Sequence, residues 1–226
     1  AGRPCQIAGL RSYLGELAQK DNLIMMDLLC FYTPSAHYFR KYLDENYGIQ
    51  NMKEVLFRNK KRGWSSNAYT LIKKDGEEIY PNPKEDAFLS MFQSALGRND
   101  VCDECQFADF PRQGDLTMGD FWGVDQHDPT WNDKKGTSLL IVNTPKGKRF
   151  LERIKADFKR IEQVPLDWCM NKGNRIGKDG LKRHPNQKYY EKLLKEVSVN
   201  EAVDMALKNK HDIGLVCVMN HNYGNN

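Results

Sequence analysis

The sequence has no long hydrophobic run, no N-glycosylation sequon and no strong excess of charge of one sign. Its longest apolar stretch, Leu23 to Phe31, is interrupted by Asp27 and falls short of the ~20 residues that span a bilayer. Lysine and arginine number 34 and aspartate and glutamate 30, so the net charge of +4 gives no reason to expect a nucleic-acid partner. We expect neither a membrane-spanning nor a nucleic-acid-binding protein.

The six cysteines do not have the dense, even spacing of a small secreted scaffold, and the first residues do not have the pattern of a signal peptide. These features favour a reducing, cytoplasmic setting, in which free thiols remain available as ligands. The 226 residues, 40% of them hydrophobic, are enough to bury a sizeable core. The five histidines form no pair at metal-ligand spacing, so cysteine is the residue type that points to a site.

Hydrophobic patterning predicts a mixed α/β fold: a mixed sheet flanked by helices, with a β-hairpin and an irregular loop that carries cysteines. Strands are expected at residues 22–30, 52–57, 116–121 and 138–142, and the hairpin at 67–80. Helices are expected at residues 7–19, 36–47, 86–96, 146–161, 186–196 and 199–208. In the first helix Ile7, Leu10, Leu14 and Leu17 recur at helical spacing and predict an amphipathic face.

Three helix ends carry local signals in the sequence. Ser35 precedes one helix as a candidate N-cap, and Gly48 is expected to end it. Ser198 precedes the last helix with Glu201 three residues on, the spacing of a capping box.

The two ends of the chain differ from its middle. It opens at a turn, Ala1 to Cys5, with no strand before it. Residues 211–220 form an apolar run typical of a buried strand, and a turn rich in glycine and asparagine follows. We therefore expect a first domain, residues 1–210, that has lost its front, and a second domain that begins within residues 211–226.

The pair Cys102-Asp-Glu-Cys105 places two sulfur atoms on one side of a tight turn, where they can share a metal ion or one face of a cluster. Cys5 and Cys30 are single cysteines that could complete a set of four ligands. A redox dithiol is disfavoured, because acidic residues separate the pair and no helix clearly follows it. The spacing does not match a zinc ribbon, but the residue types alone leave zinc and an iron–sulfur cluster equally open.

The other two cysteines, Cys169 beside Trp168 and Cys217 within the last apolar run, are expected to be buried apolar residues.

Two segments could contact a ligand. Gly2-Arg-Pro-Cys5-Gln6 precedes a helix whose first N–H groups could face an anion such as a flavin phosphate, although an ordinary turn explains it equally well. The run 114–123 has glycine at three positions, which lets the backbone approach a neighbouring element or a flat ligand closely. Asp115 and Asp120 in that run could anchor the loop or contact the ligand.

Arg58 and Lys60 are candidates to contact an anionic flavin or substrate. The run Lys60-Lys-Arg62 is equally typical of a solvated basic loop.

As a set, these segments resemble the C-terminal region of the beta-subunit family of coenzyme F420-reducing hydrogenases and dehydrogenases. The resemblance covers roughly residues 2–190. The matching stretches are residues 2–10, 27–30, 34–35, 57–58, 63–64, 102–105, 114–123, 135–138 and 142–144. Phe31-Tyr-Thr33 stands where the family usually has His-Gly-Val, so contacts to a substrate are expected to differ.

The resemblance implies an oxidoreductase that passes electrons between a flavin, FAD, and a 4Fe–4S cluster, and so favours a cluster over zinc. Carried over by position, the four cluster ligands are Cys5, Cys30, Cys102 and Cys105. The candidate flavin contacts are Gly2, Gln6, Arg58, Lys60 and Asp120. Because the front of the family's domain is absent, we expect this flavin site to be incomplete, and the resemblance names no catalytic residue.

The tail, Asp212-Ile-Gly-Leu-Val216 with Asn222-Tyr-Gly224, resembles the opening of a polysaccharide pyruvyl transferase. That likeness implies a fused transferase domain and a role in bacterial surface-polysaccharide metabolism. The expected partners are a redox protein or a small-molecule electron carrier, which need not be coenzyme F420. The alternative is a non-catalytic interaction domain in polysaccharide biosynthesis, stapled by zinc or free of metal.

Overall fold

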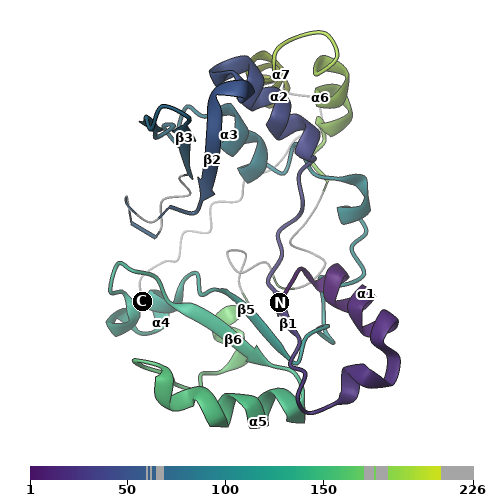
Figure 1. The fold of residues 1–226 in the computed structure, drawn as a ribbon, viewed down its shortest axis with the longest axis vertical. Coiled ribbons are helices and arrows are strands. Elements are labelled where there is room, and N and C mark those ends of the chain that lie inside the picture. The colour runs from purple at the N-terminus through teal and green to yellow at the C-terminus, as the bar shows by residue number, and fades with distance from the viewer. Residues whose placement is uncertain (60, 62, 65–68, 171–175, 177–182, 210–226) are drawn as a thin grey trace, which may run out of the picture.

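The computed structural model describes residues 1–59, 61, 63–64, 69–170, 176 and 183–209. The expected second domain at 211–226, with its Cys217, lies outside these residues, and so does the candidate ligand contact Lys60. Within the described part, the strands form two separate three-stranded sheets, each with its own helices (Figure 1). None of the helices described is long and apolar enough to cross a membrane.

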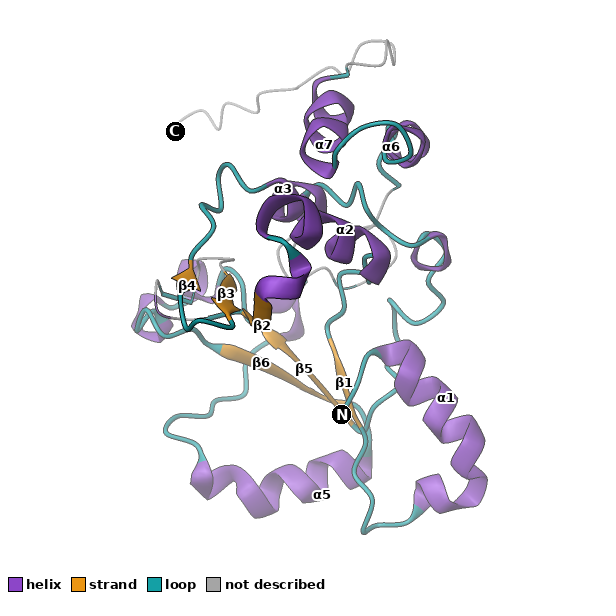
Figure 2. Cartoon of the chain, turned by 45° about the horizontal axis from the view of Figure 1, so that its top comes forward, coloured by secondary structure: helices purple, strands orange, loops and turns teal. Residues whose placement is uncertain are grey.

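The first sheet is mixed, as the sequence predicts. Its strands are β1 (Met26–Leu28), β5 (Leu116–Asp120) and β6 (Ser138–Val142), in the order β1-β5-β6. β1 runs parallel to β5, and β5 runs antiparallel to β6. The helices α1 (Pro4–Leu14) and α5 (Pro145–Ile154) flank this sheet, as both views of the chain show (Figure 2). The short helix α4 (Val124–His127) follows β5.

The second sheet is antiparallel and contains the expected hairpin. It consists of β2 (Met52–Phe57), β3 (Tyr69–Lys73) and β4 (Glu78–Ile79), with Gly76 at a positive φ of 92° in the turn. The helix α2 (Ala36–Tyr47) lies between β1 and β2 in the chain. Because β2 pairs with β3, this strand–helix–strand order joins two sheets and does not form one parallel unit.

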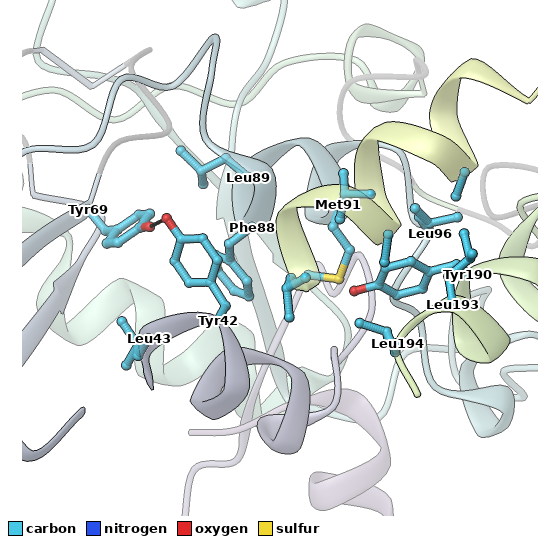
Figure 3. Close-up of a cluster of buried hydrophobic side chains, with 14 of the residues drawn as sticks. Tyr42, Leu43, Tyr69, Phe88, Leu89, Met91, Leu96, Tyr190, Leu193 and Leu194 are labelled. Carbon is cyan, nitrogen blue, oxygen red and sulfur yellow. Dashed lines mark hydrogen bonds between the residues drawn. The ribbon is translucent and has the colours of Figure 1, made fainter. Parts of the chain in front are cut away.

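The larger core lies among the helices beside the second sheet. These are α2, α3 (Ala87–Gln93), α6 (Gln187–Leu193) and α7 (Val199–Lys208). Figure 3 shows the buried side chains, with Met91 between the residues from α3 and those from α6. At one end of this core the hydroxyl groups of Tyr42 and Tyr69 donate to the buried Asp86 carboxylate, at 2.5 and 2.9 Å. Burial and these contacts raise the pKa of Tyr42, so both partners of its hydrogen bond are satisfied.

The predicted helix caps are confirmed. The Ser35 hydroxyl accepts the backbone N–H of His37 at 3.3 Å, and Gly48 follows the end of α2 with φ 68°. Ser198 and Glu201 form the expected capping box at the start of α7. These ends follow the sequence closely because a cap is a contact within a few residues.

The amphipathic face of the first helix is only partly buried. Ile7 is 3% exposed, whereas Leu10 and Leu17 are 41% and 50% exposed, and the last turn from Gly15 to Gln19 is a 3-10 helix. The spacing therefore predicts the helix correctly, but not how far the first sheet covers it. α5 also ends earlier than expected, at Ile154, which leaves the predicted helical residues that follow in a 3-10 turn and extended chain.

Candidate metal centre

Four cysteines from three distant segments line the same cavity. Cys5 lies in the first turn of α1, and Cys30 follows β1 by two residues. Cys102 ends a short 3-10 turn that begins at Asp100, and Cys105 is three residues further on. The cavity encloses about 410 Å³, counting the open solvent at its mouth. The other lining residues are Arg3, Pro4, Phe31, Tyr32, Thr33, Phe107, Ala108 and Arg112.

The chain's first residues bring Cys5 close to Cys30. The N–H of Gly2 donates to the carbonyl of Met26 at 3.0 Å, and the N–H of Leu28 donates to the carbonyl of Gly2 at 3.2 Å. Residues 1–3 therefore run beside the outer edge of β1. α1 starts next to the end of that strand, where Cys30 lies.

Arg3 and Gln6 organise the turn before α1. The Arg3 N–H donates to Gln6 Oε1 at 3.0 Å, and Pro4 occupies the first helical position, where a missing N–H costs nothing. The Arg3 guanidinium also hydrogen-bonds the Thr33 hydroxyl. The side chain of Gln6 is thus used within the turn.

An ion-pair network holds the loop that carries Cys102 and Cys105. Asp103, between the two cysteines, pairs with Arg98 and with Nε of Arg183, the latter at 3.1 Å. The side chain of Arg98 is fully buried and that of Asp103 is 14% exposed. Asp103 is therefore an anchor of the loop and not a solvated charge beside the thiols, as the sequence alone suggests.

Arg112 ties the same loop to the first sheet. Its Nη1 donates to the carbonyls of Phe107 and Ala108 at 3.2 and 3.0 Å, and its Nη2 donates to the carbonyl of Leu28 at 3.0 Å. Nη2 also lies 3.4 Å from the carboxylate of Asp27. The guanidinium thus connects the chain beyond Cys105 to the strand before Cys30.

The thiol of Cys30 reports on the other three cysteines. Its pKa is raised to about 11, first by burial and then by negative charge on Cys102, Cys5 and Cys105, while the Arg3 cation acts in the opposite direction. Four thiolates in this cavity would repel one another in surroundings that already disfavour charge. A cationic centre between them offsets that repulsion, so the donor set fits a metal centre.

The spacing of the ligands bears on the kind of centre. Within the described part of the chain, no three His, Cys, Asp or Glu side chains gather tightly enough to hold a single metal ion. Tetrahedral zinc, with Zn–S bonds of about 2.3 Å, brings its sulfur atoms to within about 4 Å of one another. The cavity therefore fits a wider centre, with metal and sulfide ions between the thiolates, better than it fits one zinc ion.

The candidate flavin contacts fall into two places. Gly2 and Gln6 lie beside Cys5, where each is bonded to its neighbours. Arg58, just after β2, pairs with Asp120 at the end of β5, with 2.8 Å between Nη2 and Oδ2. These two side chains thus meet each other where the two sheets approach.

Three of the stretches that carry the resemblance meet at this junction. Trp64 stacks on Trp122 with 4.5 Å between ring centroids and 28° between planes. A Cβ at Gly136 would lie 2.8 Å from the Trp64 ring, so only glycine fits there. The stretch that begins at Gly114 therefore packs against two others, which accounts for their joint occurrence.

The glycines of the run 114–123 serve close packing between strands. A Cβ at Gly119 would lie 2.7 Å from Cδ1 of Leu29, and one at Gly114 would lie 2.6 Å from the backbone nitrogen of Asp27. Both approach a neighbouring element, one of the two roles that the sequence left open. Asp115 likewise anchors its loop and is 1% exposed.

Sequence reasoning missed Arg98 and Arg112. Both are almost fully buried, at 2% and 8% exposure, and both act on the cysteine loop through contacts with distant residues. No local pattern marks either one. The expected apolar role of Cys169 is confirmed, because it is 2% exposed in a second small core with Phe121 and Leu139.

The comparison with known families settles which family this is. A family model that describes the C terminus of the coenzyme F420 hydrogenase/dehydrogenase beta chain matches residues 1–167. The chain belongs to this family. The match includes all four cysteines of the cavity, the loop anchors Arg98 and Arg112, and the whole first sheet.

Among solved structures, the chain resembles one from the xenon-derivatised F420-reducing [NiFe] hydrogenase complex of Methanosarcina barkeri. The two are 15% identical with a TM-score of 0.45, and the likeness covers 84% of this chain. The present chain spans 59% of the length of that hydrogenase chain. No curated protein matches it.

Proposed function

We propose that this chain is part of an electron-transfer oxidoreductase and that Cys5, Cys30, Cys102 and Cys105 hold a 4Fe–4S cluster. The observation that carries the proposal is that these four cysteines, from three distant segments, line the same cavity. Cysteine thiolates are the usual ligands of such clusters. Membership of a family of hydrogenase and dehydrogenase proteins supports a redox role.

When bound, the cluster supplies a site that takes up and gives back one electron. The chain's own residues set the conditions for that exchange. Phe31, Tyr32 and Phe107 form apolar walls of the cavity, and Tyr32 is held there by donation of its hydroxyl to the carbonyl of Phe92 at 2.9 Å. Arg3 and Arg112 bring positive charge to the walls. Hydrogen bonds, charge and exclusion of water are the means by which a protein tunes such a centre.

The proposal includes FAD as a second redox group, with a redox protein or a small-molecule carrier such as coenzyme F420 as the partner. Support for FAD comes from the family resemblance. Because Arg58 and Asp120 already pair with each other, we expect this chain alone to bind FAD weakly. Quenching of FAD fluorescence by the chain, weakened in Arg58→Ala, would support a part for Arg58; quenching of equal strength in the variant would remove Arg58 from the flavin site.

The remaining assignments concern the parent protein. We propose that residues 1–210 form the redox domain and that residues 211–226 begin a polysaccharide pyruvyl transferase domain, in a bacterial, cytoplasmic protein. The support is the short resemblance of the tail. Expression of a longer chain and an assay for pyruvyl transfer to a polysaccharide precursor would test the fusion, and absence of that activity from a folded, longer protein would count against it.

Visible absorption of protein purified without oxygen tests the cluster directly. We expect a brown protein whose broad visible absorption bleaches on reduction with dithionite. Cys30→Ser and Cys102→Ser should lose most of this absorption, whereas Cys169→Ser, a matched change outside the cavity, should keep it. A colourless wild-type protein that carries zinc would favour the stapled interaction domain instead.

A further inference from the structure

Arg112 is a buried cation in the wall of the cysteine cavity. Its side chain is 2% exposed, and its counterion Asp27 is fully buried. The side chain lines the same cavity as Cys5, Cys30, Cys102 and Cys105. Positive charge placed this deep is little screened by solvent, so it acts strongly on any charge inside the cavity.

The hydrogen bonds of Arg112 leave one donor unused. A guanidinium has five N–H groups. Nη1 and Nη2 bond the carbonyls of Phe107, Ala108 and Leu28 and reach Asp27. Nε is buried, and no atom of the described residues accepts a hydrogen bond from it. Since buried donors are nearly always satisfied, an unused N–H in a cavity wall indicates an acceptor that belongs in the cavity.

We propose that Arg112 is the electrostatic partner of the centre in this cavity, and that it raises the centre's reduction potential. Its Nε–H donates to a sulfur atom of the centre, and its charge favours the more negative, reduced state. This inference rests on the proposed cluster. With four thiolate ligands a 4Fe–4S cluster is anionic, and one electron from a donor makes it more so while no bond forms or breaks. A nearby buried cation therefore stabilises the reduced form more than the oxidised form.

Asp27 gives the inference a prediction of opposite sign. Its carboxylate lies 3.4 Å from Nη2 of Arg112 and partly cancels the positive charge. Arg112→Gln removes the cation and should lower the midpoint potential. Asp27→Asn removes the opposing anion and should raise it. Arg112→Lys keeps the charge but loses the fork of donors, so its potential should stay closer to that of wild type.

The test is a redox titration of the cluster, followed by electron paramagnetic resonance, on wild type and the three variants. Iron and sulfide are measured first on each protein, so that only fully loaded samples are compared. Arg149→Gln is the matched control, because Arg149 is 61% exposed and pairs with Asp21 on the surface of α5. Its midpoint potential should equal that of wild type.

The outcomes separate this inference from the proposed function. A lower potential in Arg112→Gln, with a higher one in Asp27→Asn, supports the inference. Fully loaded Arg112→Gln with the wild-type potential overturns it and leaves the cluster assignment intact. If Arg112→Gln does not fold, Arg112→Lys and Asp27→Asn decide: an unchanged or lowered potential in Asp27→Asn overturns the inference. A wild-type protein that takes up no iron overturns the inference and the proposed function together.

Discussion

Asp27 and Asp115 each hold the strand that the other begins. The carboxylate of Asp27, on β1, accepts the N–H groups of Gln113 and Gly114 at 2.9 and 3.0 Å. The carboxylate of Asp115, just before β5, accepts the N–H of Met25 at 2.9 Å. This reciprocal contact aligns the two parallel strands, and so fixes the end of β1 from which the chain continues to Cys30.

Asp115 should make stability depend on acid pH. Burial alone would raise the pKa of Asp115, but hydrogen bonds from Met25, Thr144 and Lys146 outweigh it, and the pKa is lowered. The stabilisation is therefore present above the unfolded pKa of about 4 and is lost as pH falls through the folded pKa. At neutral pH we expect Asp115→Asn to cost about 3 kcal/mol, the size seen when a buried ion pair loses one partner.

Urea unfolding of both proteins across a range of pH measures this effect. The difference in unfolding free energy between wild type and Asp115→Asn should be constant from pH 5 to about 7 and shrink below about pH 4. A difference that stayed constant down to pH 2 would show that the carboxylate of Asp115 is not the titrating group.

Removal of the Asp103 carboxylate should loosen the cysteine loop. Asp103→Ala takes an ion-pair partner from the buried Arg98, and a broken buried pair costs about 3–5 kcal/mol. Residues that orient metal ligands typically contribute 10–100-fold to metal affinity, so iron should be released to a chelator faster by about that factor. The measurement is the rate of iron loss after anaerobic loading.

A matched acidic residue provides the control for Asp103. Asp204 pairs with Lys208 at 2.8 Å on the exposed face of α7. Asp204→Ala should change neither the stability nor the rate of iron loss, because exposed pairs contribute little. Equal effects of the two substitutions would contradict an anchoring role for Asp103.

Gly147 should not tolerate a side chain. A Cβ at this position in α5 would collide with the backbone carbonyl of Asp115 and would lie 2.9 Å from its carbonyl carbon. Gly147→Ala should therefore push α5 off the first sheet and cost about 1–3 kcal/mol. Gly9→Ala, in α1 with nothing within 4 Å of the added atom, should instead stabilise by about 0.5–1 kcal/mol. Thermal unfolding of both variants gives the comparison, and a stabilising Gly147→Ala would refute the close packing.

Features set by neighbours in the sequence were predictable. The caps at Ser35 and Ser198 depend on contacts two or three residues away. β2 and β6 have the predicted bounds, because alternation and β-branched or aromatic content mark a strand within its own length. The four cysteines were also identified from sequence, since thiols and a Cys-x-x-Cys pair name a ligand type directly.

Features set by distant contacts were not predictable. Arg112 reaches the carbonyl of Leu28, 84 residues earlier, and nothing near either residue marks that contact. Leu10 and Leu17 have the spacing of a buried face, yet they stay exposed because periodicity gives a helix's apolar side and not what covers it. The division of the strands between two sheets is likewise a matter of long-range pairing.

Iron, acid-labile sulfide and zinc, measured together on anaerobically purified protein, test the central claim most directly. We predict about four iron and four sulfide per chain, lost when Cys102 and Cys105 are both changed to serine and kept in Cys169→Ser. About one zinc per chain without sulfide, in a wild-type protein that is folded and anaerobically handled, would contradict the account and leave a domain stapled by a structural metal.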